Sequence, residues 1–271
     1  MTPMDLLSAN LTVSYRTSPP VVRDLRLNIQ RGEIVGLVGH SGSGKSSLAS
    51  ALLGLIGCKG GNVCGSVLWN GRELLAQKES DWQSIRGKQI AFVPQSPISS
   101  LNPALRLRTQ LEEAWKLHRK SGRDERKAAI LRALQDVSLP ATDDFLARFP
   151  SQISVGQAQR FLIAMAILHG PQLLIADEPT SALDAITQAE ILGLFAQLNR
   201  ERGMAILFIS HDLLSVYSLC HRVALLDGGS IVECGTPQQV FFNPRHTFTQ
   251  KLVAALPALP APEEAESELS F

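Results

Sequence analysis

A glycine-rich segment, GHSGSGKS, carries the clearest chemical signal in the sequence. It occupies residues 39–46 and matches the pattern GxxxxGK[ST], in which glycines let consecutive backbone N–H groups curl around phosphate oxygens. Lys45 has the reach to bind the outer phosphates of a nucleotide, and the Ser46 hydroxyl is a ligand for Mg²⁺. A flexible Gly/Ser linker is the alternative interpretation. The predicted phosphate-binding residues are Gly39, His40, Ser41, Gly42, Ser43, Gly44, Lys45, Ser46 and Ser47.

Two adjacent carboxylates, Asp177 and Glu178, follow the apolar run 173–176. In such a pair, one carboxylate holds Mg²⁺ through water, and its neighbour polarises an attacking water as a general base. Adjacent acidic residues are common, so this signal depends on the apolar strand before them and on the phosphate loop elsewhere in the chain. The alternative interpretation is a capped helix start, with Pro179 as its first residue.

Three further polar side chains stand where apolar segments end. Gln95 follows Val93 and Pro94 and has an oxygen suited to Mg²⁺ and to the attacking water. Ser154 precedes a strongly helical run, so with that helix N-terminus it forms a second candidate phosphate site. His211 ends the run that begins at residue 205, and its ring is suited to contact a γ-phosphate. Each has a structural alternative: a satisfied loop glutamine, an N-cap serine and a strand-end histidine.

Alternating and continuous apolar segments predict the elements that position these side chains. Residues 11–15 and 25–29 alternate apolar with polar, which is typical of strands with one buried face. The runs 34–38, 173–176 and 205–209 are continuously apolar, which is typical of strands buried on both faces of a parallel sheet. Polar residues follow each of these three runs, so we expect the functional groups to gather at the carboxyl ends of the strands.

Helix-forming residues dominate the middle of the chain, from about residue 95 to residue 150. Apolar side chains recur there at helical spacing, as at Leu111 and Trp115 and again at Ile130 and Leu134. The sequence therefore predicts a helical lobe inserted between strands. The last fifteen residues contain three prolines and four glutamates but no basic residue, so we predict that residues 257–271 form a disordered acidic tail.

Composition excludes several classes of protein. The chain has 271 residues, of which 45% are hydrophobic, and its net charge is +1. The hydrophobic fraction argues against general disorder, and the near-zero charge gives no basis for a nucleic-acid-binding surface. Four cysteines without a CxxC pair argue against a disulfide scaffold. No apolar run approaches the length of a membrane span, and the N-terminal residues lack the pattern of an export signal, so we expect any membrane role to be peripheral.

Taken in order, GHSGSGKS, the Gln95 loop, SVGQ, LLIADEP, SALD and His211 resemble the nucleotide-binding subunit of an ATP-binding cassette (ABC) transporter. The resemblance implies an α/β fold of the P-loop NTPase class, with a RecA-like core, an N-terminal antiparallel β-subdomain and an inserted α-helical subdomain. We expect one nucleotide-binding domain over residues 1–256. Its parts are a core at 1–95 and 161–235, a helical subdomain at 96–160 and a C-terminal extension at 236–256.

The resemblance also implies roles for individual residues and the cofactors ATP and Mg²⁺. Glu178 matches the general base, His211 the γ-phosphate switch and Lys45 the phosphate-binding lysine of the catalytic set. Tyr15 matches the aromatic residue that stacks on adenine, with a plain surface tyrosine as the alternative. The implied metal ligands are Ser46, Gln95 and Asp177. The implied interface residues are those of the signature loop, which closes over ATP on the opposite subunit, and the crossing aspartate: Ser154, Gly156, Gln157 and Asp184.

Val155 departs from the family's usual signature, SGGQ, because it replaces the first glycine. A β-branched residue resists positive φ and adds bulk where the backbone approaches phosphate. We therefore hypothesise a heterodimer with unequal ATP sites, in which the site that contains Val155 turns over more slowly. The alternative is that valine is tolerated because the backbone there has negative φ.

Two segments resemble the peptide and nickel importer group of this family. They are Ser100–Pro103 and the stretch 242–252, and the absence of cysteines after Cys234 tilts the interpretation toward nickel or metal-chelate members over peptide importers. The resemblance implies an ATP-hydrolysing motor on the cytoplasmic face of the inner membrane. Its implied partners are two permeases, a second ATPase subunit and an extracytoplasmic solute-binding protein. A soluble ABC ATPase and a nucleotide-sensing regulatory subunit are the alternatives.

Overall fold

A computed structural model of the chain describes residues 5–16, 19–119 and 122–256. The chain divides into two compact units, one formed by residues 1–77 with 207–271 and the other by residues 78–206. The expected acidic tail at 257–271 lies outside the described residues.

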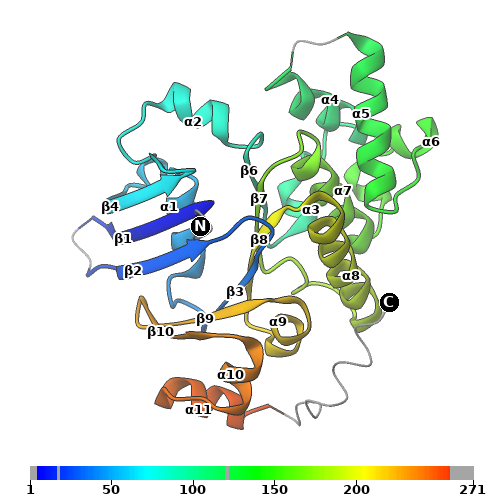
Figure 1. Ribbon diagram of the computed structural model, residues 1–271. Coiled ribbons are helices and arrows are strands. Elements are labelled where there is room, and N and C mark those ends of the chain that lie inside the picture. The colour runs from blue at the N-terminus through cyan, green and yellow to red at the C-terminus, as the bar shows by residue number, and fades with distance from the viewer. Residues whose placement is uncertain (1–4, 17–18, 120–121, 257–271) are drawn as a thin grey trace. The chain divides into compact units, whose positions relative to one another are not determined.

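The first unit contains the predicted N-terminal antiparallel sheet, in which β1, β2 and β4 lie side by side (Figure 1). Its strands are, in order across the sheet, β2 (Val22–Ile29), β1 (Leu7–Tyr15), β4 (Gly61–Trp69) and β5 (Arg72–Glu73). The alternation in the sequence has its expected cause, since Leu25, Leu27 and Ile29 are buried while their polar neighbours on β2 are exposed. Register pairs Leu11 of β1 with Leu25 of β2.

A second group of strands in this unit includes the strand that precedes the phosphate loop. Its order is β10 (Ser230–Gly235), β9 (Arg222–Asp227), β3 (Ile34–Val38) and β8 (Ala205–Ser210), and the division between the units falls within β8. Every residue of β3 is buried, and β3 runs parallel to β9. The helices of this unit are α1 (Lys45–Leu52), η1 (Gly57–Lys59), α9 (Leu213–Leu219), α10 (Pro237–Phe242) and α11 (Thr247–Ala254).

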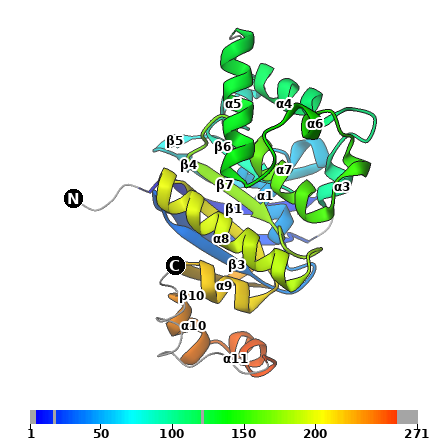
Figure 2. The same ribbon diagram turned by 90° about the vertical axis from the view of Figure 1, so that its right-hand side faces the viewer.

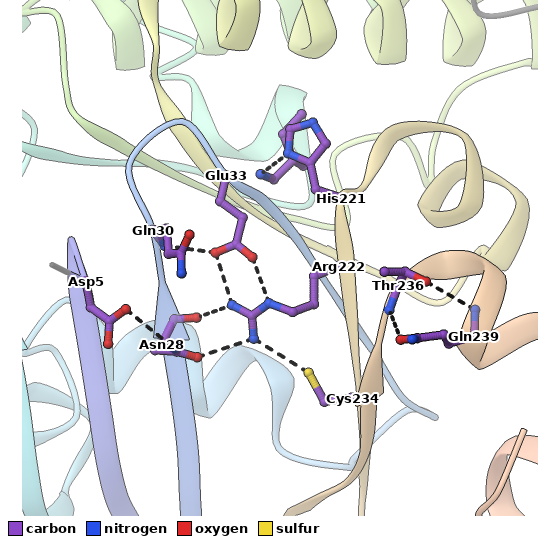
Figure 3. Close-up of polar contacts among 10 residues, drawn as sticks. Asp5, Asn28, Gln30, Glu33, His221, Arg222, Cys234, Thr236 and Gln239 are labelled. Atoms are coloured by element: carbon purple, nitrogen blue, oxygen red, sulfur yellow. Dashed lines mark hydrogen bonds and ion pairs between the residues drawn. The ribbon is translucent and has the colours of Figure 1, made fainter. Parts of the chain in front are cut away.

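An ion pair between Arg222 and Glu33 connects β9 to the turn before β3 (Figure 3). The guanidinium donates to both carboxylate oxygens at 2.7 and 3.0 Å and to the Asn28 carbonyl at 2.6 Å. Both side chains are largely buried, and Glu33 raises the pKa of Arg222. Because one guanidinium satisfies acceptors from two segments, this network fixes β9 against the β2–β3 connection.

The second unit pairs two parallel strands with a run of helices. Its strands are β6 (Ile90–Val93) and β7 (Leu173–Asp177). Its helices are α2 (Glu79–Ile85), α3 (Pro97–Ser100), α4 (Leu107–Lys116), α5 (Arg123–Asp136), α6 (Asp143–Leu146), η2 (Pro150–Gln152), α7 (Val155–Ile167) and α8 (Ala185–Arg202). Figure 2 shows α4, α5, α6 and α7 packed together. The predicted helical insertion is therefore confirmed as the stretch between β6 and β7.

The polar face of this helical stretch is fixed by ion pairs and by stacked rings. Arg160 of α7 donates to Glu190 of α8 at 2.8 Å and to the Val137 carbonyl after α5 at 3.0 Å. His169 stacks on Trp115, and its Nε2 donates to the Ala114 carbonyl oxygen at 3.1 Å. Among the described residues, no helix combines the length and the apolar character that crossing a bilayer requires.

Candidate functional site

The predicted phosphate loop lies between the end of β3 at Val38 and the start of α1 at Lys45. Gly44 has φ of 108°, and a Cβ on it would lie 2.7 Å from the Val21 carbonyl oxygen. Gly229 approaches the same oxygen equally closely, since its added Cβ would also lie 2.7 Å away. Both positions therefore require glycine, and the turn into α1 depends on the first of them.

Lys45 closes the loop on itself. Its ammonium group donates to the Gly39 carbonyl at 2.7 Å and to the His40 carbonyl at 3.0 Å, and the residue is only 6% exposed. The Ser43 N–H donates to the His40 carbonyl at 3.2 Å, which tightens the same turn. The structure thus brings Lys45 together with the other loop residues that the motif predicted.

The donor set of this loop suits a nucleotide triphosphate with a divalent cation. The first N–H groups of α1 have no acceptor within the helix, so this end of α1 favours an anion. The Ser46 hydroxyl is on an exposed residue at the same end, as a cation ligand must be. The Lys45 ammonium supplies positive charge beside them. The fit rests on this donor set and on a loop that admits no side chain at Gly44.

Tyr15 lies at the end of β1 and contacts the start of α1. Its hydroxyl donates to Ser47 Oγ at 3.2 Å, and a Cβ on Gly61 would lie 2.8 Å from its ring. Two residues predicted separately as nucleotide contacts are therefore neighbours. Motif spacing gave no sign of this contact, because 32 residues separate the pair in the chain.

His40 has a partner that sequence reasoning missed. Its Nε2 lies 3.2 Å from Asp227 Oδ1, and its Nδ1 lies 2.8 Å from the Ser41 carbonyl oxygen. Asp227 is the last residue of β9, whose sequence RVALLD is itself a short apolar run that ends in a carboxylate. That pattern, the same one that identified Asp177, was the available signal. His211 is exposed directly after β8, as expected, and Asp212 next to it caps α9.

In the second unit, Gln95 and Glu178 are brought together. The Gln95 amide Nε2 donates to Glu178 Oε2 at 2.9 Å. Parallel register explains the meeting, because Val93 of β6 pairs with Ala176 of β7 and each functional residue lies two positions beyond its strand partner. Since the amide nitrogen binds Glu178, the Gln95 carbonyl oxygen is the atom suited to a cation or a water.

Glu178 has a backbone conformation that costs free energy. Its φ is 48°, in the left-handed region that non-glycine residues seldom adopt. The Ser181 N–H and hydroxyl both donate to the Glu178 carbonyl, at 3.3 and 3.1 Å, and hold the turn. Asp177 before it is 7% exposed and ends β7. A strained conformation held by neighbours is typical of functional positions.

Ser154 and Gln157 form a reciprocal cap at the start of α7. Ser154 Oγ accepts from the Gln157 N–H, and Gln157 Oε1 accepts from the Ser154 N–H, both at 3.1 Å. Val155 is the first helical residue and is 41% exposed. It is not among the residues with positive φ, so the expectation of backbone strain there is wrong. The alternative of a negative φ is correct, because a helix start needs no glycine; what remains of the hypothesis is the added bulk.

Asp184 caps α8 with both of its carboxylate oxygens. Oδ1 accepts from the Thr187 N–H at 2.9 Å, and Oδ2 accepts from the Thr187 hydroxyl at 2.8 Å. These bonds, the backbone one first, lower the pKa of Asp184. The carboxylate is therefore fully ionised at neutral pH and is held in one orientation.

Comparisons with known proteins agree with this arrangement. The family model for ABC transporters matches residues 22–181. The chain is 42% identical over 246 residues to the glutathione import ATP-binding protein GsiA of Salmonella choleraesuis, covering 89% of this chain but only 40% of GsiA. It is 41% identical over 250 residues to the oligopeptide transport ATP-binding protein OppD of Escherichia coli, covering 92% of this chain and 73% of OppD.

A solved structure supports the same assignment. The ATP-binding cassette MJ0796, in a dimeric post-hydrolysis state bound to ADP and Pi, superposes with a TM-score of 0.73 at 28% identity, covering 85% of this chain and 98% of that one. The likeness includes the P-loop NTPase core with antiparallel N-terminal strands and a helical insertion. By the extent of the family match and by its similarity to OppD, the chain belongs to the ABC transporter family.

Proposed function

We propose that this chain is the motor subunit of an ABC importer, which binds ATP with Mg²⁺, hydrolyses it and couples hydrolysis to uptake of a small solute. The Gln95–Glu178 hydrogen bond is the observation that carries the proposal. A carboxylate fixed by an amide, on a strained turn at the end of a buried strand, is prepared to accept a proton from water. A nucleotide sensor without turnover has no need of such a base.

The residues divide the chemistry between them. Lys45 and the first N–H groups of α1 bind phosphate oxygens. The Ser47 hydroxyl and the Tyr15 ring lie beside the start of α1. Ser46, Gln95 and Asp177 would hold Mg²⁺, which when bound neutralises charge that develops on the phosphates. Glu178 takes the proton of the attacking water, and His211 contacts the γ-phosphate. The residues that bind phosphate are thus distinct from the residue that accepts the proton.

A second ATPase subunit belongs to this proposal. The relative MJ0796 is described as dimeric, and Ser154, Gly156, Gln157 and Asp184 match the family residues that face a partner's nucleotide. A heterodimer with unequal sites is favoured, a homodimer being the alternative, and the argument now depends on the exposed bulk of Val155 alone. Two permease subunits and an external solute-binding protein would complete the importer, with this chain on the cytoplasmic face of the membrane.

Short peptides are the solutes that the relatives favour. OppD is named for oligopeptide transport and GsiA for glutathione import, so a peptide backbone or a glutathione-like tripeptide is the proposed cargo class. Nickel or a metal chelate is the second candidate, because residues 100–103 and 242–252 resemble the group that contains both peptide and nickel importers.

Reconstitution tests both parts of the proposal. The chain is assembled with the permeases, ATPase and binding protein encoded beside it, and ATP hydrolysis and uptake of labelled peptide, glutathione and nickel are measured in liposomes. We expect hydrolysis that a peptide-loaded binding protein stimulates. Hydrolysis accompanied by uptake of nickel but not of peptide or glutathione would favour nickel as the cargo. The absence of any hydrolysis in the assembled complex would contradict the motor function.

A further inference from the structure

The starts of α7 and α8 meet at Gly156 and Thr187. A Cβ on Gly156 would lie 2.8 Å from Thr187 Cγ2 and 3.9 Å from Thr187 Oγ1. A real Cβ does not come that close to another carbon, so only a hydrogen atom fits between the two helix starts. Gly156 is therefore required by the methyl group opposite it, and its own backbone is ordinary helix.

The Thr187 side chain has one available orientation. Its hydroxyl donates to Asp184 Oδ2 at 2.8 Å while its N–H donates to Asp184 Oδ1 at 2.9 Å. A β-branched side chain is stiff about χ1, so fixing Oγ1 also fixes the direction of Cγ2. The two bonds to Asp184 thus aim the methyl group at Gly156.

The other side of the contact is equally fixed. Ser154 and Gln157 cap each other across Gly156, so the start of α7 cannot shift without breaking two hydrogen bonds of 3.1 Å. Beside the contact, Val155 is 41% exposed and Ile186 is 76% exposed. The contact therefore lies between two segments, residues 154–157 and 184–187, each of which has an exposed apolar side chain.

We propose that Thr187 is a positioning residue that holds the 154–157 loop and the Asp184 loop in one relative position. The inference rests on the proposed function, in which both loops act on nucleotide held by the second ATPase subunit. Thr187 touches no reacting group in this scheme. It acts through Asp184 by hydrogen bonding and through Gly156 by steric contact, so the two loops move as one piece when the cassettes pair.

Four variants separate this role from general stability. Gly156→Ala places a methyl group against Thr187 Cγ2. Thr187→Ser removes that Cγ2 but keeps both bonds to Asp184, and Thr187→Val keeps a methyl group at this position but loses the hydroxyl. The double variant Gly156→Ala with Thr187→Ser removes the clash. Gly193→Ala is the matched control, because Gly193 is an exposed residue of α8 whose added Cβ meets nothing within 4 Å.

The assembled transporter is measured for kcat and for the KM of ATP, and each chain for hydrogen exchange over residues 151–157 and 181–187. We expect Gly156→Ala to lower kcat about tenfold and to raise exchange in both segments, since overpacking forces the helix starts apart. The double variant regains the kcat and exchange of Thr187→Ser, Thr187→Val lowers kcat, and Gly193→Ala matches wild type. The KM of ATP stays constant in Gly193→Ala, because Gly193 lies outside the segments that face nucleotide in the proposed scheme.

Two results would overturn the inference: an unchanged kcat in Gly156→Ala, or a double variant no better than Gly156→Ala alone. Restored exchange and melting temperature without restored kcat would assign the contact to stability only and would also overturn it. A wild-type complex without ATP hydrolysis would instead contradict the proposed function. Hydrogen exchange would then still decide whether Thr187 couples the two loops.

Discussion

The Gln95 amide and the Glu178 carboxylate meet at 2.9 Å because β6 and β7 pair Val93 with Ala176. Two residues separated by 83 positions in the chain are thereby placed by strand register, which tolerates no slip without moving every side chain to the opposite face. The contact gives Glu178 a defined orientation before any ligand arrives.

Removing the charge of Glu178 separates binding from hydrolysis. In Glu178→Gln an amide oxygen still accepts from Gln95, so the turn at φ 48° is kept, while the proton acceptor is lost. We expect kcat to fall about 10²- to 10⁴-fold, the range of a general base, with little change in nucleotide affinity. Steady-state hydrolysis and titration with a fluorescent ATP analogue measure the two quantities. Normal turnover in this variant would show that Glu178 is not the base.

Substitutions at Gln95 remove the group that orients Glu178. In Gln95→Glu a second carboxylate replaces the amide that donates to Glu178 Oε2, so charge repulsion replaces the hydrogen bond and kcat should fall. Gln95→Ala removes the hydrogen bond without adding charge and should lower kcat less. Steady-state ATP hydrolysis by both variants measures the difference. Equal kcat values for the two variants would disprove an electrostatic contact in the working enzyme.

Lys45 should contribute to nucleotide affinity and to the stability of its loop. Lys45→Ala removes the donor to the Gly39 and His40 carbonyls, so we expect weaker ATP binding and a free energy of unfolding lower by about 1–3 kcal/mol. Lys59→Ala is the control, since Lys59 donates to Ser50 Oγ at 2.8 Å in the same unit but outside the loop. Calorimetric ATP titration and urea unfolding should show a loss of affinity in the first variant only.

The Arg222–Glu33 pair should contribute more to stability than an exposed pair. Arg222→Met leaves the largely buried Glu33 carboxylate without its partner, and we expect a loss of about 2–4 kcal/mol in the free energy of unfolding. Arg108→Met breaks the more exposed pair with Asp143 and should cost much less stability. Chemical unfolding of both variants tests the contrast. Equal losses in the free energy of unfolding would show that burial does not determine how much an ion pair stabilises the fold.

Acid should weaken the second unit through two histidines. Burial lowers the pKa of His169, and for His118 burial acts first and the neighbouring His169 second. Both rings are thus kept neutral in the fold but bind protons when unfolded, near pH 6.5. Stability from these groups is present above that pH and is lost as the pH falls through it toward the folded pKa values. Urea unfolding at pH 7.5 and 5.5 should show a smaller drop for His169→Gln than for wild type.

Much of the fold followed from local pattern. The alternation in β2 and the unbroken apolar runs of β3 and β7 identified strands because burial acts on each residue separately. The phosphate loop followed for a related reason, since glycine at position 44 is demanded by a local turn. The end of β9 has the same pattern, but no motif surrounds Asp227, so the apolar run alone did not predict a site there.

Contacts between distant segments were beyond the sequence. Nothing in the residue types states that Tyr15 binds Ser47 or that Asp227 binds His40, because both pairs depend on strand order. Val155 shows the opposite error, in which a family pattern suggested strain and the helix start removed it. Thr187 has no signal in the sequence, since its importance comes only from what lies opposite Gly156.

The Val21 carbonyl oxygen sets a limit on how this cassette can change over time. Gly44 of the phosphate loop and Gly229 of the β9–β10 turn both approach that one atom, each within a distance that forbids a side chain. A sequence change in any one of these three segments, which are far apart in the chain, is therefore constrained by the other two. A lengthened β1–β2 connection, whether from natural drift or from an epitope inserted by an engineer, would displace the oxygen and disturb the nucleotide loop even though no motif residue had been altered.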